Sequence, residues 1–151
     1  MTRSYEDFFL GELFELPPYQ LDEEEMIAFA QRYDPQDFHT DPQAAEESPF
    51  GGLIASGWLT TSVLMRMQCD GYMADTTCIG SPGVDEIRWL APVRPGDVLS
   101  GTAEVVGLKP SRSRPDRGLV SCKVRLCNQT GEVVMTLTTL ALFLTAAPES
   151  R

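Results

Sequence analysis

The segment from Ser56 to Gln68 places the tightest limit on how this chain can fold. Its apolar residues point in almost every direction around a helical axis; they are Trp58, Leu59, Val63, Leu64, Met65 and Met67. A helix that is apolar nearly all round is a buried one, because no side of it is suited to water. We therefore expect a covering layer of the chain to wrap around one central helix.

The second half of the chain supplies strands that could form this layer. After a loop containing Gly71, Gly80 and Gly83, apolar and polar side chains alternate along residues 119–128, which is the period of a half-buried strand. The predicted strands are residues 86–90, 98–108, 119–128 and 132–144, with turns at 92–97 and 128–131. The last strand is largely apolar, so we expect it to sit centrally in its sheet.

A strand and a helix are predicted in the first half of the chain. Residues 12–16 have the character of a short strand, which we expect to close at Pro17-Pro18. A helix should begin at Asp22, because Asp22 and Glu25 have the spacing of a capping box and apolar residues then recur at helical intervals.

Two prolines set the next boundaries. Pro35 disfavours helical geometry at the residue before it, so the helix that begins at Asp22 should end at Asp34. A short helix of residues 42–47 follows, with proline in its first position and either Asp41 or Thr40 as its N-cap.

Helices come first along this chain, and strands joined by hairpins follow. This order favours an α+β layer fold with an antiparallel sheet. We expect residues 1–151 to form a single domain, because the chain has the length of one domain and contains no repeat or linker. A single curved sheet would leave its edges and part of the central helix uncovered, which predicts a homodimer or a dimer-based oligomer.

The acidic composition limits the partners of this protein. A net charge of −10 argues against a nucleic acid or an anionic membrane as partner, because both attract positively charged surfaces. The N-terminal residues lack the apolar core of a signal peptide, and no apolar run is long enough to span a bilayer. We therefore expect a cytoplasmic protein, in which any polyanionic ligand would need a local basic cluster.

The cysteines do not form a metal-binding pattern. Cys69, Cys78, Cys122 and Cys127 contain no C-x-x-C pair, and Cys122 and Cys127 would face opposite sides of one strand. Buried, reduced thiols are the simpler interpretation. We expect neither a metal ion nor a disulfide.

Asp34 and His39 are the strongest candidates for catalysis. Either residue alone is more often structural: aspartate forms turns before proline, and a lone histidine is usually a core residue. Together they occupy a break between two helices, and a carboxylate with an imidazole is a competent acid/base set near neutral pH. The chain has no G-x-S-x-G nucleophile motif, so covalent acyl transfer has no support in the sequence.

Gly57 lies in or beside the first turn of the central helix. Glycine within a helix costs roughly 0.5–1 kcal/mol relative to alanine, so its presence suggests that another group approaches the backbone here. The first N–H groups of a helix have no helical partner and carry positive partial charge, so they can hold a developing oxyanion. Tight packing between helix and sheet is the alternative explanation.

These motifs resemble the MaoC-like (R)-specific enoyl-CoA hydratases. The resemblance rests on Asp34 and His39 with four residues between them, Asp41, the step Ile54-Ala55-Ser56-Gly57, and the later run Trp89-Leu90-Ala91-Pro92-Val93-Arg94-Pro95-Gly96-Asp97. It covers roughly residues 10–145. It implies the hot-dog fold, in which a curved antiparallel sheet wraps a long central helix.

The resemblance also implies a reaction and its participants. Asp34 and His39 would act on one water molecule, and the Gly57 amide would bind the thioester oxygen. The reaction would be reversible hydration of a trans-2-enoyl-CoA to an (R)-3-hydroxyacyl-CoA, as in fatty acid metabolism. Coenzyme A would enter as part of the substrate, and no metal or redox cofactor would be needed.

The chain departs from the family pattern beside these residues. The family commonly has Asn-Pro where this chain has Gln36-Asp37, and histidine where it has Ser56. The longer side chain of Gln36 could place its amide group where the family has that of asparagine. Asp37 either raises the pKa of a neighbouring group or points into solvent. Ser62 matches a polar support position, although a buried serine bonded to a backbone carbonyl fits equally well.

A basic cluster between two strands is the candidate for the phosphates of coenzyme A. It consists of Lys109, Arg112, Arg114 and Arg117. A solvated hairpin loop is the alternative for this segment. Arg88 and Arg94 are further candidates, because they lie near the Pro-Gly-Asp turn.

Two other functions stay open at the level of the sequence. One is hydrolysis of an acyl-CoA thioester on the same fold. The other is a non-catalytic acyl-CoA-binding or partner subunit, which the changes at Asp37 and Ser56 would fit. Coenzyme A is favoured over acyl carrier protein as the carrier, since such carriers are acidic like this chain.

Overall fold

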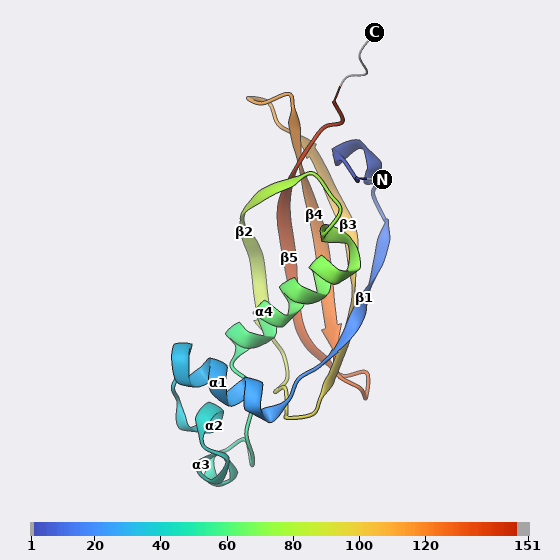
Figure 1. Ribbon diagram of the computed structural model, residues 1–151. Coiled ribbons are helices and arrows are strands. Elements are labelled where there is room, and N and C mark those ends of the chain that lie inside the picture. The colour runs from blue at the N-terminus through green and yellow to red at the C-terminus, as the bar shows by residue number, and fades with distance from the viewer. Residues whose placement is uncertain (1, 148–151) are drawn as a thin grey trace.

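The computed structural model describes residues 2–147 and contains one antiparallel sheet, with three short helices grouped at one end and a fourth crossing the sheet (Figure 1). The helical elements are η1 (Tyr5–Asp7), α1 (Glu23–Tyr33), α2 (Asp37–Thr40), α3 (Pro42–Glu47), α4 (Gly57–Gln68) and the π-helical turn η2 (Cys69–Met73). The strands are β1 (Leu13–Gln20), β2 (Cys78–Trp89), β3 (Val98–Pro110), β4 (Arg117–Cys127) and β5 (Val133–Leu144).

The strand order β1-β3-β4-β5-β2 puts β5 inside the sheet, as its apolar sequence predicted. It pairs with β4 from Arg117↔Leu144 to Cys127↔Val133 and with β2 on its other side. The predicted strand at residues 86–90 is too short, because β2 begins at Cys78. Glycines that were expected in a loop lie inside β2, where positive φ values and register shifts mark bulges.

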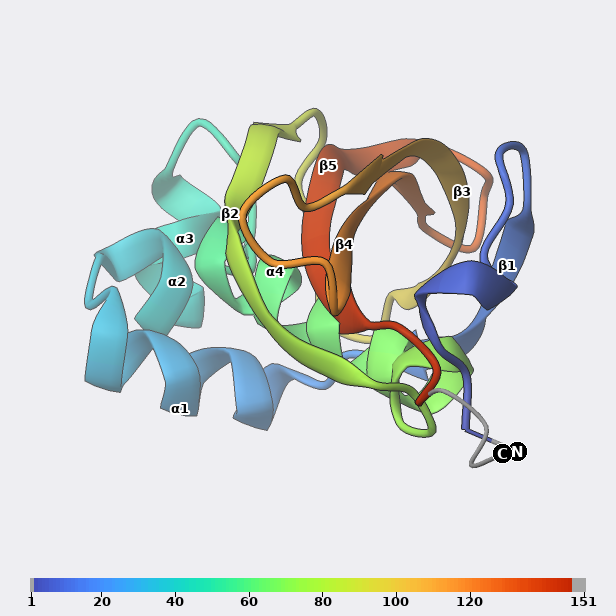
Figure 2. The same cartoon turned by 90° about the horizontal axis from the view of Figure 1, so that it is seen from above.

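Helix α4 lies against the concave side of the curved sheet, which bends around it (Figure 2). Leu59, Val63 and Leu64 are buried in the common core. The expectation of burial on every side is wrong for this single chain, because Trp58 and Met65 keep 58% and 47% of their surface exposed. The sheet covers one face of the helix and leaves the other to solvent or to a partner.

Strand β1 continues through Pro17-Pro18, so the predicted closure at these prolines is wrong. Its pairing with β3 shifts register between Leu16 and Tyr19. Proline is tolerated here because β1 is an edge strand, where a missing N–H costs no ladder hydrogen bond on the open side.

The helix boundaries around the candidate site agree with the sequence. The Asp22 carboxylate caps α1 by accepting from the Glu25 N–H at 2.7 Å, and the helix ends at Asp34. The Asp41 side chain, rather than Thr40, caps α3. The break between α1 and α3 is not fully irregular, however, because residues 37–40 form the single turn α2.

The predicted α+β hot-dog architecture is confirmed: a helix packs in the hollow of one curved antiparallel sheet (Figure 2). Within residues 2–147, no helix is long and apolar enough to cross a membrane. The four cysteines are free thiols, but only Cys122 is fully buried.

Candidate active site

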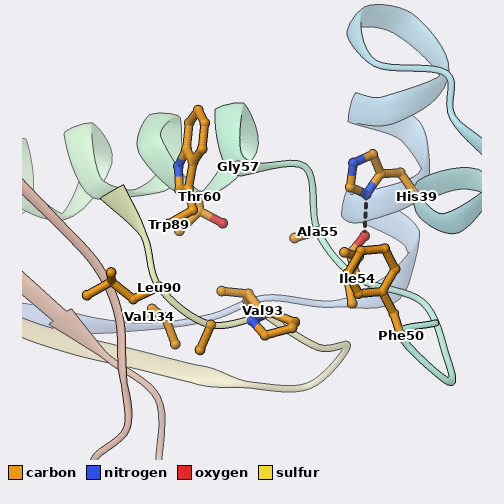
Figure 3. Close-up of a pocket in the computed structure, with 12 residues that line it drawn as sticks. His39, Phe50, Ile54, Ala55, Gly57, Thr60, Trp89, Leu90, Val93 and Val134 are labelled. Atoms are coloured by element: carbon orange, nitrogen blue, oxygen red, sulfur yellow. Dashed lines mark hydrogen bonds between the residues drawn. The ribbon is translucent and has the colours of Figure 1, made fainter. Parts of the chain in front are cut away.

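His39 is buried beneath the segment that leads into α4. Its Nδ1 lies 2.7 Å from the carbonyl oxygen of Ile54 (Figure 3), and only 6% of the residue is exposed. A carbonyl oxygen can only accept, so Nδ1 must carry the hydrogen. In the neutral ring Nε2 is therefore unprotonated and available as a base.

Asp34 stands at the end of α1 and faces this nitrogen. Its Oδ2 lies 3.3 Å from His39 Nε2 and accepts a hydrogen bond from Ser56 Oγ at 2.7 Å. Its Oδ1 accepts from Gln36 Nε2 at 2.6 Å. The structure thus brings together four of the residues singled out in the sequence, two of them at positions where the chain departs from the family pattern.

The surroundings of Asp34 keep its carboxylate ionised. Burial acts to raise the pKa of Asp34, but the hydrogen bonds from Gln36 and Ser56, together with nearby His39, outweigh burial and lower the pKa below its ordinary value of 3.8. The ionised carboxylate and the unprotonated Nε2 are then both acceptors. Side by side, they can bind the two hydrogens of one water molecule.

Gly57 is the first residue of α4, after Ser56 as N-cap. The Ser56 hydroxyl accepts from the Trp58 N–H, and its carbonyl accepts from the N–H groups of the two residues that follow Trp58. Among the described residues, no acceptor is bonded to the Gly57 N–H. The indole of Trp89 covers this glycine: a Cβ at position 57 would lie 2.5 Å from Trp89 Cε2. Close packing, one of the two suggested reasons for glycine, is therefore found here, against the Trp89 indole. The role of the Gly57 N–H as an oxyanion donor stays a prediction.

A pocket of about 270 Å³ contains His39 and Gly57 on its wall (Figure 3). The other lining residues are Phe50, Ile54, Ala55, Thr60, Trp89, Leu90, Ala91, Pro92, Val93 and Val134. Asp34, Gln36 and Ser56 are not among the lining residues; they reach the pocket through the contact of Asp34 with His39 Nε2. The pocket is therefore largely apolar, and its polar features include the His39 imidazole, the Thr60 hydroxyl and a helix N-terminus.

Sequence reasoning missed Thr60, which lies one turn after Gly57 and lines the same pocket. The helical period was the available signal, since residues three apart share a face. Ser62 is on the other face of α4, where it is exposed and its hydroxyl donates to the Trp58 carbonyl at 2.8 Å. Asp37 is also exposed.

The candidate arginines do not line this pocket. Arg112 and Arg114 belong to the β3–β4 hairpin, at the end of the sheet away from α2 and α3 (Figure 1). Arg88 is exposed on β2. Arg94 is held beside the pocket, where its Nη2 donates to the carbonyl of Phe50 at 2.5 Å.

Comparison with known proteins places this geometry in a family. The sequence model of the MaoC-like domain matches residues 9–124, which is most of the chain. The chain belongs to the MaoC-like domain family. The hot-dog fold described above is the fold of this family's solved members.

Three proteins similar to this chain include two dehydratases and one regulatory protein. The solved MaoC-like dehydratase of Rhodospirillum rubrum is 36% identical, with a TM-score of 0.84 over 95% of this chain and 98% of that one. The 3-hydroxyacyl-thioester dehydratase Z of Mycobacterium tuberculosis is 31% identical over 69% of this chain and 70% of its own length. A monoamine oxidase regulatory protein of Archaeoglobus is 29% identical, with a TM-score of 0.88 and 97% coverage of both chains.

Removing either hydrogen-bond donor to Asp34 is expected to raise the pKa of its carboxyl. The group's pKa is lowered by folding, so it stabilises the native state above its ordinary pKa, and this stabilisation is lost as pH falls through the lowered value. In Gln36→Leu or Ser56→Ala the loss should begin at higher pH, because burial is less opposed. A titration of the Asp34 carboxyl carbon by NMR measures this, and an unmoved midpoint in both variants would contradict it.

Proposed function

We propose that this protein adds water reversibly to a trans-2-enoyl-CoA, giving the (R)-3-hydroxyacyl-CoA. One observation carries the proposal: His39 Nε2 lies 3.3 Å from Asp34 Oδ2, beside a pocket that also contains the free N–H of a helix start. Membership of the MaoC-like family and likeness to dehydratases support the reaction class.

Each group has a defined part in the hydration step. His39 Nε2 takes a proton from water as the water oxygen forms a bond to C3 of the enoyl group. The electron pair of the C2–C3 double bond moves toward the thioester, whose oxygen gains negative charge. C2 then accepts from the His39 imidazolium the proton that His39 took from the water, and the thioester carbonyl forms again. The Gly57 N–H, at the positive end of α4, stabilises that oxygen.

Asp34 acts beside His39 Nε2, at 3.3 Å from it. Its carboxylate stays ionised, so it holds the water and favours the imidazolium that forms when His39 takes the proton. Ser56 and Gln36 fix both carboxylate oxygens, which reduces the freedom that Asp34 would have at a helix end. Gln36 and Ser56, two of the three residues that depart from the family pattern, thus support the Asp34–His39 pair.

Coenzyme A is the proposed carrier of the acyl group, and no separate cofactor takes part. A net charge of −10 disfavours an acidic carrier protein. Arg94 is the cation beside the pocket that could meet the phosphates, and exposed Arg88 stays a candidate. Arg112 and Arg114 lie at the far end of the sheet, so they would reach the same coenzyme only from a second copy of the chain.

A homodimer is proposed as the working unit. The edge strand β2 and the outer face of α4 expose a set of large apolar side chains: Trp58, Met65, Ile79, Val84, Trp89 and Leu90. An open strand edge beside such a set favours pairing with another copy.

The solution mass tests this assembly. Sedimentation equilibrium is expected to give about twice the chain mass of 16.7 kDa. Val84→Lys, which places a charge on the edge strand, should shift the equilibrium toward the monomer. Glu46→Lys on the exposed side of α3 is the control and should not. A monomeric wild-type protein at micromolar concentration would contradict the proposal.

The direct test of function is loss of the enoyl-thioester absorbance of crotonyl-CoA. Hydration consumes this absorbance and releases no thiol. Release of free thiol would instead identify a thioesterase, and tight acyl-CoA binding without turnover would identify a non-catalytic subunit.

A further inference from the structure

Two cavities follow one another along the same three elements. The pocket of His39 is bounded by the start of α4, the end of β2 and the start of β5, through Gly57, Trp89 and Val134. A second cavity of about 330 Å³ is bounded by later α4, earlier β2 and later β5, for example at Leu64 and Val84. The two cavities share no lining residue.

A three-residue partition stands between the two cavities. The Trp89 indole from β2 covers Gly57 and donates from Nε1 to Thr61 Oγ1 at 3.3 Å. Thr61 from α4 in turn lies 3.5 Å from the sulfur of Met135 on β5. Trp89 lines the first cavity and Thr61 lines the second, so this contact is the boundary.

The second cavity has the lining of a hydrocarbon site. Its apolar side chains come from all three elements and from η2; they include Leu64, Met65, Met73, Val84, Leu137 and Leu140. Two of its polar side chains satisfy each other, because the Tyr72 hydroxyl donates to Gln68 Oε1 at 2.9 Å. No Lys, Arg, Asp or Glu lines it, so a charged ligand would be unpaired there.

We infer that Trp89 sets the acyl-chain length of this protein, by closing the pocket of His39 against the apolar cavity beyond it. The inference rests on the proposed function, because it assumes an acyl thioester in the first pocket. With the indole in place, a short acyl group fits and a longer one meets the ring. Removal of the indole joins the two cavities into one tunnel for a medium or long acyl tail.

The test compares chain lengths in wild type and in Trp89→Ala. For hydration, the ratio of kcat/KM for trans-2-octenoyl-CoA to that for crotonyl-CoA should rise about tenfold or more. A single methylene group in an apolar pocket can change kcat/KM by about this factor. Trp89→Phe, which keeps a ring, should change the ratio less. Filling the second cavity with Ala141→Phe in the Trp89→Ala background should cancel the gain.

A matched control is Phe9→Ala. Phe9 is an exposed aromatic residue that lines neither cavity. The chain-length ratio of this variant should stay within about twofold of wild type. A wild-type protein that already prefers octenoyl-CoA, or an unchanged ratio in Trp89→Ala, would overturn the inference.

Binding of saturated acyl-CoAs separates this inference from the proposed function. Octanoyl-CoA should bind Trp89→Ala more tightly than wild type by calorimetry, while butyryl-CoA should not gain. If wild type hydrates no enoyl-CoA but this gain in binding is found, the proposed function fails and the role of Trp89 stands. If hydration is found without the gain in binding or in the kinetic ratio, the role of Trp89 fails and the function stands.

Discussion

His39→Ala is expected to lower kcat for crotonyl-CoA hydration by about 10²- to 10⁴-fold, the usual contribution of a positioned acid/base group. The ring is buried, its Nδ1 is committed to the Ile54 carbonyl, and its Nε2 is the base available beside the pocket. Stopped-flow measurement of enoyl absorbance at saturating substrate gives kcat directly.

Asp34→Asn should lower kcat within the same range, because it removes the charge that favours the imidazolium while preserving size. The control is Asp37→Asn, which removes an exposed carboxylate two residues before His39 and should leave kcat unchanged. Circular dichroism melting of each variant separates lost chemistry from lost folding. Wild-type rates in folded His39→Ala and Asp34→Asn would remove both residues from the mechanism.

Gly57→Ala is expected to lower both the stability of the fold and the rate of hydration. The new methyl group would lie 2.5 Å from Cε2 and 2.6 Å from Cδ2 of Trp89, closer than carbon atoms can approach. The indole must therefore move. The free energy of unfolding should fall by about 1–3 kcal/mol, the usual cost of overpacking. Urea unfolding measures the change.

A double-mutant cycle with Trp89→Ala identifies the cause. If the clash is with the indole, the two substitutions are strongly non-additive, and Gly57→Ala costs little once the indole is absent. The alanine keeps its backbone N–H, so the double variant should also regain crotonyl-CoA hydration relative to Gly57→Ala alone. Additive losses would show that glycine is required here for a reason other than Trp89.

Local sequence signals predicted the parts of the fold that neighbouring residues determine. Pro35 ends α1 at Asp34, and Asp41, one of the two predicted N-cap candidates beside Thr40, caps the helix that begins at the next residue. The long apolar run of β5 predicted an interior strand. In each case one residue or one short pattern fixes the backbone, without help from distant segments.

The errors arise where tertiary contacts override these local signals. Gly80 and Gly83 have the composition of a loop, yet pairing with β5 draws them into β2 as bulged positions. Pro17-Pro18 predicts the end of a strand, but β1 continues through both prolines because it lies at the open edge of the sheet. The residues of β1 and β2 do not reveal that these strands pair with β3 and β5.

For the candidate site, the sequence indicated residues but little of their arrangement. Asp34, His39 and Gly57 were chosen from their residue types and order along the chain, and their catalytic roles stay predictions. The hydrogen bonds from Gln36 and Ser56 to Asp34 depend on the path of the chain between α1 and α4. Local sequence patterns do not determine this path. Trp89 comes from a strand far along the sequence, and no pattern in the chain predicts that its ring covers Gly57.

Hydration of crotonyl-CoA in water enriched with ¹⁸O tests the central claim most directly, because it traces the oxygen that the Asp34–His39 pair activates. The label is expected at C3 of (R)-3-hydroxybutyryl-CoA, with the thioester intact, and its incorporation should be lost in His39→Ala. Label in a free carboxylate, which shows hydrolysis, or unconsumed crotonyl-CoA with the wild-type protein would contradict the claim.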